Sequence, residues 1–235
     1  MVSVRLLVAV LTLAVVACGG TPQAATSPAV KPTPDCTSDG QGFNVTSSAG
    51  YTRRGAVYGS GPAVVIAHQS QQTRCDVVPI ARWLSENHYA AVVVDLGGDW
   101  TGLLAATAIL MRERGSPSIQ LLGASKGGCD AMVVGSQVNP PVSAVLSLGG
   151  ERRVRPELDA DTAVAHSHVP LLIVTSENDG FLSGDEARIL MKESASTDKK
   201  LLVLPGSLHG FAMLDGPDGS EVRQTILGFL AAHAG

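Results

Sequence analysis

The six residues Gly123-Ala124-Ser125-Lys126-Gly127-Gly128 decide the fold of this chain. They follow an apolar run, Ile119-Gln120-Leu121-Leu122, and precede a segment over residues 128–138 that we predict to be helical. Glycines on both sides of the serine permit a turn so tight that side chains there would clash with neighbouring backbone. The stretch therefore predicts a sharp strand-to-helix turn that lifts the Ser125 hydroxyl above a sheet, over the N-terminus of a helix.

Continuous apolar runs alternate with amphipathic segments along most of the chain, as in strands that are buried on both faces of a parallel sheet. The expected strands are 63–67, 89–94, 119–122, 142–148, 170–175 and 200–204, after a hairpin of 43–45 and 53–58. The expected helices are 76–86, 101–114, 128–138, 186–194 and 221–233. The alternation predicts an α/β fold, a doubly wound and mostly parallel sheet with helices on both faces.

The length and composition favour one domain and exclude some classes of function. A chain of 235 residues that is 45% hydrophobic can bury one substantial core. The formal net charge is −4 and Lys and Arg form no cluster, so we expect no nucleic-acid partner. Aromatic residues make up only 4% of the chain, which argues against a stacking platform for carbohydrate or single-stranded nucleic acid.

The N-terminal residues have the character of an export signal rather than of a folded domain. The apolar run 2–17 carries Arg5 near its start and is too short for a comfortable membrane span, so we interpret residues 1–17 as a signal peptide. The sequence Val15-Val16-Ala17-Cys18-Gly19 resembles the bacterial lipobox. This resemblance implies cleavage before Cys18 and its lipidation, with anchoring to the extracytoplasmic face of the cell membrane. An ordinary secretory signal with a chance cysteine is the alternative.

Residues 18–35 are rich in Pro, Thr and Ala and are expected to be a flexible tether, which leaves 36–235 as the folded domain. Export implies an oxidising compartment. Cys36 and Cys75 are candidates for a disulfide that ties the start of the domain to the first large helix, although pairing cannot be deduced from sequence. Cys129 lies on the helix after Ser125, where we expect it to pack as a small apolar residue.

Polar residues gather where the predicted strands end, and the ends of parallel strands share one edge of the sheet, where ligands bind. Five strands are followed by His68-Gln69-Ser70, Asp95-Leu96-Gly97-Gly98, the Ser125 turn, Ser176-Glu177-Asn178-Asp179-Gly180 and Ser207-Leu208-His209-Gly210-Phe211. The edge thus holds a serine, an aspartate and a histidine in that chain order. A serine hydroxyl needs a base within hydrogen-bond reach to act as a nucleophile, and imidazole is suited to that task.

These three motifs, G-A-S-K-G, S-E-N-D-G-F and S-L-H-G-F, resemble those of the α/β-hydrolase superfamily over residues 43–232. The short form without a cap domain and the H-G-F ending look like dienelactone-hydrolase-like and related small serine esterases, although dienelactone hydrolases carry Cys where this chain has Ser125. The resemblance implies that Ser125 is the nucleophile, His209 the base and Asp179 its orienting acid. The backbone N–H groups of Lys126 and Gln69 would stabilise the oxyanion.

Other residues of the same loops have competing interpretations. Glu177 could replace Asp179 as the acid, although Asp179-Gly180 forms the better turn. Asp95 and Asp99 are alternative acids in a neighbouring loop, although Asp95 is expected to bond loop amides. His68 is expected to support the Gln69 loop. The Lys126 side chain is expected to face solvent, with pairing to an acidic substrate group as the alternative. His166 and His168 form an H-x-H pair without a neighbouring carboxylate or cysteine, so we expect no metal site.

The leading function is hydrolysis of carboxylic esters, with a small-molecule or acyl-ester substrate and no cofactor, by a protein expected to be monomeric. Thioester or peptide hydrolysis would use the same three residues, and a non-catalytic envelope lipoprotein that uses the fold as a binding module is the alternative from another class. About twenty residues separate Gly149 from Val169. That length is too short for a large lid, so we expect an open site.

Overall fold

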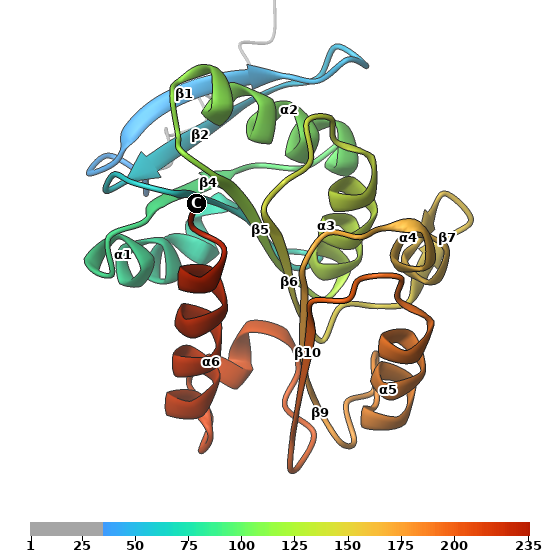
Figure 1. Ribbon diagram of the computed structural model, residues 1–235. Coiled ribbons are helices and arrows are strands. Elements are labelled where there is room, and N and C mark those ends of the chain that lie inside the picture. The colour runs from blue at the N-terminus through green and yellow to red at the C-terminus, as the bar shows by residue number, and fades with distance from the viewer. Residues whose placement is uncertain (1–34) are drawn as a thin grey trace, which may run out of the picture. The chain divides into compact units, whose positions relative to one another are not determined.

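The computed structural model describes residues 35–235, shown as the coloured ribbon in Figure 1. The predicted signal peptide, the lipidation of Cys18 and nearly all of the predicted tether lie outside the described residues. Within residues 35–235, no helix is long and apolar enough to cross a membrane.

One eight-stranded sheet forms the centre of the described domain, in the order β1-β2-β4-β3-β5-β6-β9-β10. β2 pairs antiparallel with β1 and with β4, and all the other neighbours are parallel, which confirms the predicted hairpin and the mostly parallel sheet. The strands are β1 (Gln41–Thr46), β2 (Thr52–Tyr58), β3 (Ala63–Ala67), β4 (Ala90–Val94), β5 (Ile119–Ala124), β6 (Ala144–Leu148), β9 (Leu171–Ser176) and β10 (Lys199–Leu204).

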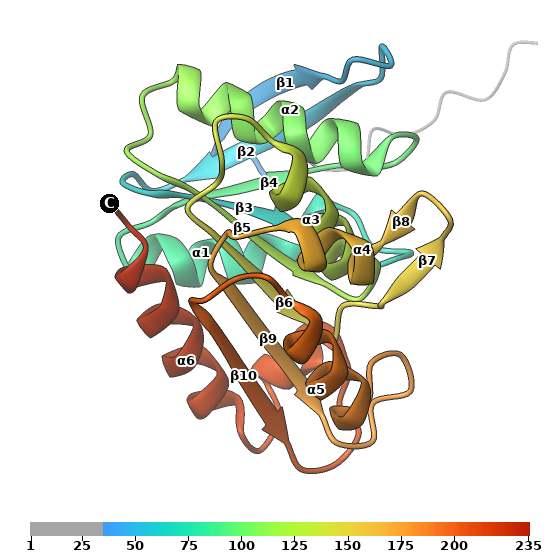
Figure 2. The same ribbon diagram turned by 45° about the vertical axis from the view of Figure 1, so that its right-hand side comes forward.

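Helices cover both faces of this sheet, as Figures 1 and 2 show. One face packs against α2 (Trp100–Glu113), α3 (Lys126–Gln137), α4 (Ala160–His166) and α5 (Gly184–Glu193). The other face packs against α1 (Val78–Glu86) and α6 (Gly219–Ala232), together with the short 3-10 turns η1 (Arg74–Val77) and η2 (Gly210–Leu214). The prediction of helices on both faces of the sheet is therefore confirmed.

Each central strand contributes to two separate cores because successive side chains point to opposite faces. In β3, Val65 packs in the core beneath α2 and α3, whereas Val64 and Ile66 pack in the core beneath α1 and α6. All three side chains are fully buried. Burial on both sides explains why these strands appear in the sequence as continuous apolar runs rather than as an alternating pattern.

The segment between β6 and β9 holds structure that the sequence did not predict. It forms a small hairpin of β7 (Arg153–Arg155) and β8 (Leu158–Asp159), followed by helix α4. Asp159 caps that helix by accepting a hydrogen bond from the Thr162 N–H at 3.1 Å. Elements of two, three and seven residues are too short to produce a clear hydrophobic period in the sequence. Together they are also far smaller than a cap domain.

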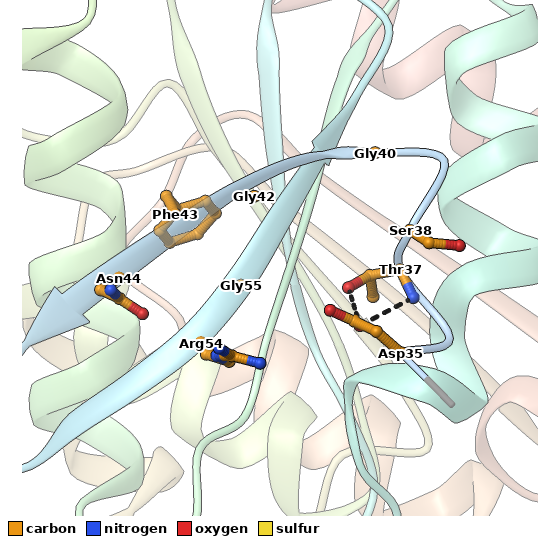
Figure 3. Close-up of a pocket in the computed structure, with 9 residues that line it drawn as sticks. All are labelled: Asp35, Thr37, Ser38, Gly40, Gly42, Phe43, Asn44, Arg54 and Gly55. Carbon is orange, nitrogen blue, oxygen red and sulfur yellow. Dashed lines mark hydrogen bonds between the residues drawn. The ribbon is translucent and has the colours of Figure 1, made fainter. Parts of the chain in front are cut away.

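A disulfide between Cys36 and Cys75, with 5.6 Å between the Cα atoms, holds the start of the domain against η1. The hollow drawn in Figure 3 lies beside this link and has a volume of about 380 Å³. Its lining comes from β1, β2 and the turn before them, where the Asp35 carboxylate accepts hydrogen bonds from the N–H and hydroxyl of Thr37. None of the residues predicted to be functional lines this hollow.

Removing the disulfide should destabilise the domain without changing its fold. The bond joins residues 39 positions apart, and a loop of that size gives a chain-entropy loss of about 3–4 kcal/mol in the free energy of unfolding. We expect this loss for Cys36→Ser/Cys75→Ser in urea unfolding followed by tryptophan fluorescence. Wild-type protein treated with dithiothreitol should show the same loss, and an unchanged denaturation midpoint in both samples would contradict the prediction.

Candidate active site

Ser125 occupies the sharp turn between β5 and α3. Its backbone has φ 54° and ψ −129°, a conformation that residues other than glycine seldom adopt. The turn is held on both sides, because the Ser125 N–H donates to the Leu148 carbonyl at 3.1 Å and the Ser125 carbonyl accepts from the Gly128 and Cys129 N–H groups. Strain of this kind persists only where the surroundings enforce it, and it presents the hydroxyl at the carboxyl edge of the sheet.

The flanking glycines are required by backbone packing. A Cβ atom at Gly123 would lie 2.1 Å from the Gly127 carbonyl oxygen. A Cβ atom at Gly127 would lie 2.3 Å from the Ala67 carbonyl oxygen and 2.4 Å from that of His68. The first residues of α3 therefore touch the backbone at the end of β3, and this contact brings the loop of His68 and Gln69 beside Ser125.

Asp179 and His209 form a pair at the same edge, from the loops after β9 and β10. His209 Nδ1 lies 2.8 Å from Oδ2 and 3.0 Å from Oδ1 of the Asp179 carboxylate. That carboxylate is buried, and it also accepts the Phe181 N–H at 2.8 Å. The two loops are joined a second time, because the Ser176 hydroxyl donates to the Leu208 carbonyl at 2.7 Å. Asp179 is therefore held in place by its own loop while it orients the imidazole.

Gly149, at the end of β6, leaves the space that the Asp179–His209 pair occupies. A Cβ atom at this position would lie 2.8 Å from Asp179 Oδ2 and 3.0 Å from His209 Nδ1. The residue also has φ +55°, which favours glycine. On another side of the imidazole, the exposed ring of Phe181 packs with 4.4 Å between ring centroids. The histidine is thus confined between a glycine backbone and an aromatic ring.

The Ser125 hydroxyl is hydrogen-bonded to Glu151 rather than to His209. Its Oγ donates to Glu151 Oε1 at 3.4 Å. His209 Nε2 is buried and has no hydrogen-bond partner among residues 35–235. The structure thus brings Asp179 and His209 into contact and Ser125 to the same edge, without a hydrogen bond from the serine to the imidazole. In the absence of substrate, contacts of this kind are often long and tighten only in the complex.

The two predicted oxyanion donors are both backbone N–H groups. The Lys126 N–H is in the first turn of α3, where N–H groups have no acceptor within the helix. The Gln69 N–H donates a hydrogen bond to Oε1 of Gln72 at 3.2 Å, so the side-chain amide oxygen of Gln72 occupies the acceptor position at this N–H. The Gln69 side chain points the other way, because its Oε1 accepts the Phe211 N–H at 3.0 Å and so ties this loop to the His209 loop.

A cavity of about 450 Å³ opens beside these groups. Gln69, Gln72 and His209 line one side of it. Other lining residues come from η1, α1, η2 and α6, among them Asp76, Pro79, Ile80, Phe211, Leu214 and Arg223. The cavity is large enough for part of a small ligand, and His209 is the residue of the Asp179–His209 pair that borders it.

The Lys126 side chain does not face solvent, so that prediction is wrong. It is only 14% exposed, and its Nζ lies 2.6 Å from the fully buried Oδ2 of Asp130. The same Nζ lies 3.6 Å from the centroid of the Trp100 ring, a cation–π contact. Burial lowers the pKa of Lys126 and raises the pKa of Asp130, and in each case the charge of the partner opposes the shift. The i,i+4 spacing of the two residues on α3 was the sequence signal for this pair.

This buried pair is connected to the Gln69 loop through aromatic contacts. The Trp100 ring meets the His68 ring edge-on, with 4.5 Å between centroids. His68 Nδ1 lies 2.9 Å from the Gln69 carbonyl, and His68 Nε2 accepts the Leu96 N–H at 3.3 Å, which defines the tautomer. Burial lowers the pKa of His68 and favours this neutral form. The Lys126 side chain therefore braces the loop that carries the other candidate oxyanion donor.

The competing residues have other partners. Glu177 accepts two hydrogen bonds from the Arg188 guanidinium instead of approaching His209. Asp95 accepts the Arg74 N–H at 3.0 Å and also pairs with its guanidinium, as expected of a structural acid. Cys129 is fully buried, and desolvation raises the pKa of its thiol to about 12, which makes it inert. His166 and His168 bond backbone carbonyls, and the part of the chain that the structure describes contains no cluster of metal ligands.

Comparison with solved structures identifies the fold. An esterase of Pyrococcus furiosus superposes with a TM-score of 0.73 at 15% identity, covering 88% of this chain and 96% of that one. The α/β hydrolase GrgF of a Penicillium species matches with a TM-score of 0.70 at 15% identity, covering 82% and 98% of the two chains. This is the α/β-hydrolase fold.

A third α/β-hydrolase-fold neighbour is a monoacylglycerol lipase of Paleococcus ferrophilus, with a TM-score of 0.66, 13% identity and coverage of 77% and 99%. No protein-family model and no curated protein sequence matches this chain. The likeness is therefore one of structure, and within this α/β-hydrolase fold Ser125 stands at the strand-to-helix turn, with Asp179 and His209 in later loops.

Sequence reasoning missed Glu151 and Gly149 because it passed over the end of β6. Gly149-Gly150-Glu151 follows a buried strand that lies next to β5, so the same rule that found the other loops applies here as well. It also missed Trp100, whose role depends on a contact between α2 and α3 that no spacing within one element reveals.

Breaking the buried Lys126–Asp130 pair should strongly destabilise the domain. Lys126→Met leaves the Asp130 carboxylate buried without its cation, and we expect the free energy of unfolding to fall by about 3–5 kcal/mol. Adding Asp130→Asn should recover part of that loss, because a neutral amide costs less to bury than a charge.

The measurement is chemical denaturation of the two variants beside Lys192→Met, which removes an exposed lysine from α5 and should stay within about 0.5 kcal/mol of wild type. Equal stability of Lys126→Met and wild type would show that the pair contributes nothing.

Proposed function

We propose that this domain is a serine hydrolase that cleaves carboxylic esters through an acyl-enzyme, with Ser125 as nucleophile, His209 as base and Asp179 as orienting acid. One observation carries the proposal: a serine in a strained turn between strand and helix shares the carboxyl edge of the sheet with a buried Asp–His pair. A serine N-cap or a packing histidine would not need these features. Among esterases, the small type without a cap domain, like the dienelactone-hydrolase-like enzymes, agrees best with the sequence motifs.

In the proposed first step the Ser125 hydroxyl attacks the ester carbonyl as His209 Nε2 takes its proton. Within residues 35–235 the buried Nε2 has no hydrogen-bond partner, so it has the capacity to accept that proton. Asp179 holds Nδ1 and stabilises the imidazolium that forms. His209 then returns the proton to the departing alcohol, and an acyl group remains on Ser125.

In the second step water attacks the acyl-enzyme and the same groups act in the same order. His209 takes a proton from the water, the carboxylic acid leaves, and the proton returns to Ser125. Each tetrahedral intermediate carries a negative oxygen, which the Lys126 N–H at the start of α3 and the Gln69 N–H would bind. For this, the oxyanion takes the place of the Gln72 amide oxygen beside Gln69.

We propose esters as the substrates because the solved neighbours include proteins described as an esterase and a monoacylglycerol lipase. Thioesters and peptides remain alternatives with the same machinery. The short connection between β6 and β9 and the cavity next to His209 support an open site for small or short acyl groups. We also propose that Cys18 is lipidated and that the domain works on the outer side of the cell membrane, and a disulfide at Cys36 agrees with such an oxidising location.

Ser125→Ala should lower kcat for p-nitrophenyl acetate by at least about 10⁴-fold, because it removes the proposed nucleophile. Asp179→Asn should lower kcat by about 10⁴-fold, because the amide would favour the wrong imidazole tautomer. The measurement is steady-state hydrolysis by each purified variant, with circular dichroism as the check on folding.

Glu177→Gln is the matched control, since it removes the other carboxylate of the same loop, and its kcat should stay within about twofold of wild type. If Glu177→Gln lost activity and Asp179→Asn kept it, Glu177 would be the orienting acid. If Ser125→Ala retained near wild-type turnover, another residue would be the nucleophile and the proposal would fail.

A further inference from the structure

Glu151 stands beside the proposed nucleophile and forms no salt bridge with any residue of 35–235. It follows Gly149-Gly150 at the end of β6, and its Oε1 accepts the Ser125 hydroxyl at 3.4 Å. The residue is partly exposed, so its carboxylate borders the space in front of Ser125. The proposed reaction assigns no task to this carboxylate, because Asp179 already serves His209.

The cations around Glu151 are each engaged by another carboxylate. The pairs are Lys126–Asp130 at 2.6 Å, Arg152–Asp161 at 2.7 Å, Arg153–Asp159 at 2.8 Å and Arg155–Glu157 at 3.6 Å. Within residues 35–235, Glu151 takes part in no salt bridge and accepts no hydrogen bond except that from Ser125. The carboxylate thus adds an uncompensated negative charge to the site.

That charge opposes the proposed reaction of a neutral ester. The tetrahedral intermediate places a negative oxygen next to Ser125, and a carboxylate within hydrogen-bond distance of the same serine repels it. A substrate that carries a cation next to its scissile carbonyl removes this penalty, because Glu151 then has a counter-charge in the complex. A substrate with an anionic group at that place is repelled by the Glu151 carboxylate and by the negative oxygen of its own tetrahedral intermediate.

An aromatic surface at the other side of the site fits the same kind of group. Phe181 packs on His209 through its ring, yet 58% of the residue remains exposed. An aromatic ring attracts ammonium and especially alkylated ammonium groups, which it can contact without a hydrogen bond. The site therefore offers a carboxylate next to Ser125 and an aromatic ring next to His209.

We propose that Glu151 makes the site selective for substrates with an ammonium or quaternary ammonium group close to the scissile carbonyl. This inference rests on the proposed hydrolase function and specifies its substrate class. The cation can belong to the acyl part, as in amino-acid esters, or to the alcohol part, as in choline esters. The chemistry that Glu151 recognises is the same in both.

Two pairs of esters test the charge at constant shape. Acetylcholine is compared with 3,3-dimethylbutyl acetate for the alcohol side, and alanine methyl ester with methyl isobutyrate for the acyl side, all at pH 7. In at least one pair, the wild-type ratio of kcat/KM for the cationic ester to kcat/KM for the neutral ester should be about ten or more. This ratio should fall in 0.5 M NaCl, because salt screens a partly exposed charge.

Glu151→Gln keeps the shape of the side chain and removes its charge. It should lower the ratio of that pair severalfold or more, with kcat/KM falling for the cationic ester and rising severalfold for the neutral one. Opposite changes for the two esters cannot result from a general loss of structure. Glu157→Gln is the matched control, because it removes an exposed carboxylate from the neighbouring hairpin, and it should keep the wild-type ratio.

Three results would overturn the inference. A ratio near one in both pairs for the wild-type protein would leave the hydrolase function intact and refute the cation selectivity. An equal loss for both esters in Glu151→Gln would show that Glu151 positions Ser125 instead of recognising charge. If the wild-type protein hydrolyses none of the four esters, the proposed function itself fails, and the inference fails with it.

Discussion

The close approach of helix α3 to the end of strand β3 is the constraint on which the rest of the site depends. The Gly127 backbone lies so near the carbonyls of Ala67 and His68 that no side chain fits between them. This contact brings two elements together that are separated by about sixty residues of chain. The contact sets the distance between the two candidate oxyanion donors, the N–H groups of Lys126 and Gln69. The same contact requires the tight turn that raises Ser125.

The strain at Ser125 is held by the structure around it. A residue other than glycine with φ near 54° loses about 1–3 kcal/mol relative to a relaxed backbone. The turn cannot relax, because β5 is paired on both sides by β3 and β6 and because α3 is packed in a fully buried core. The Lys126–Asp130 pair and Trp100 add a second brace from α3 to the His68 loop. Rigidity at this edge is therefore a property of the whole sheet, and it favours pre-organised chemistry.

The sheet and most helices could be predicted from sequence because they depend on local patterns. The run at residues 63–67 is apolar because both faces of β3 are covered, and the glycines around Ser125 are there because a turn needs them. What could not be predicted depends on contacts between distant elements. The burial of the Lys126 side chain results from a ring on α2, and the position of Glu151 beside Ser125 results from the neighbouring positions of β5 and β6. The need for glycine at position 149 likewise depends on Asp179 and His209, which pack against its backbone.

We propose that Ser125 is an activated nucleophile, and covalent labelling of this serine is the direct test. The purified domain is treated with a fluorophosphonate, and the site of modification is located by mass spectrometry of its peptides. We expect one adduct per chain, on Ser125, that forms much more slowly in His209→Gln. An unlabelled protein, or an adduct on a serine other than Ser125, would show that Ser125 is not the nucleophile.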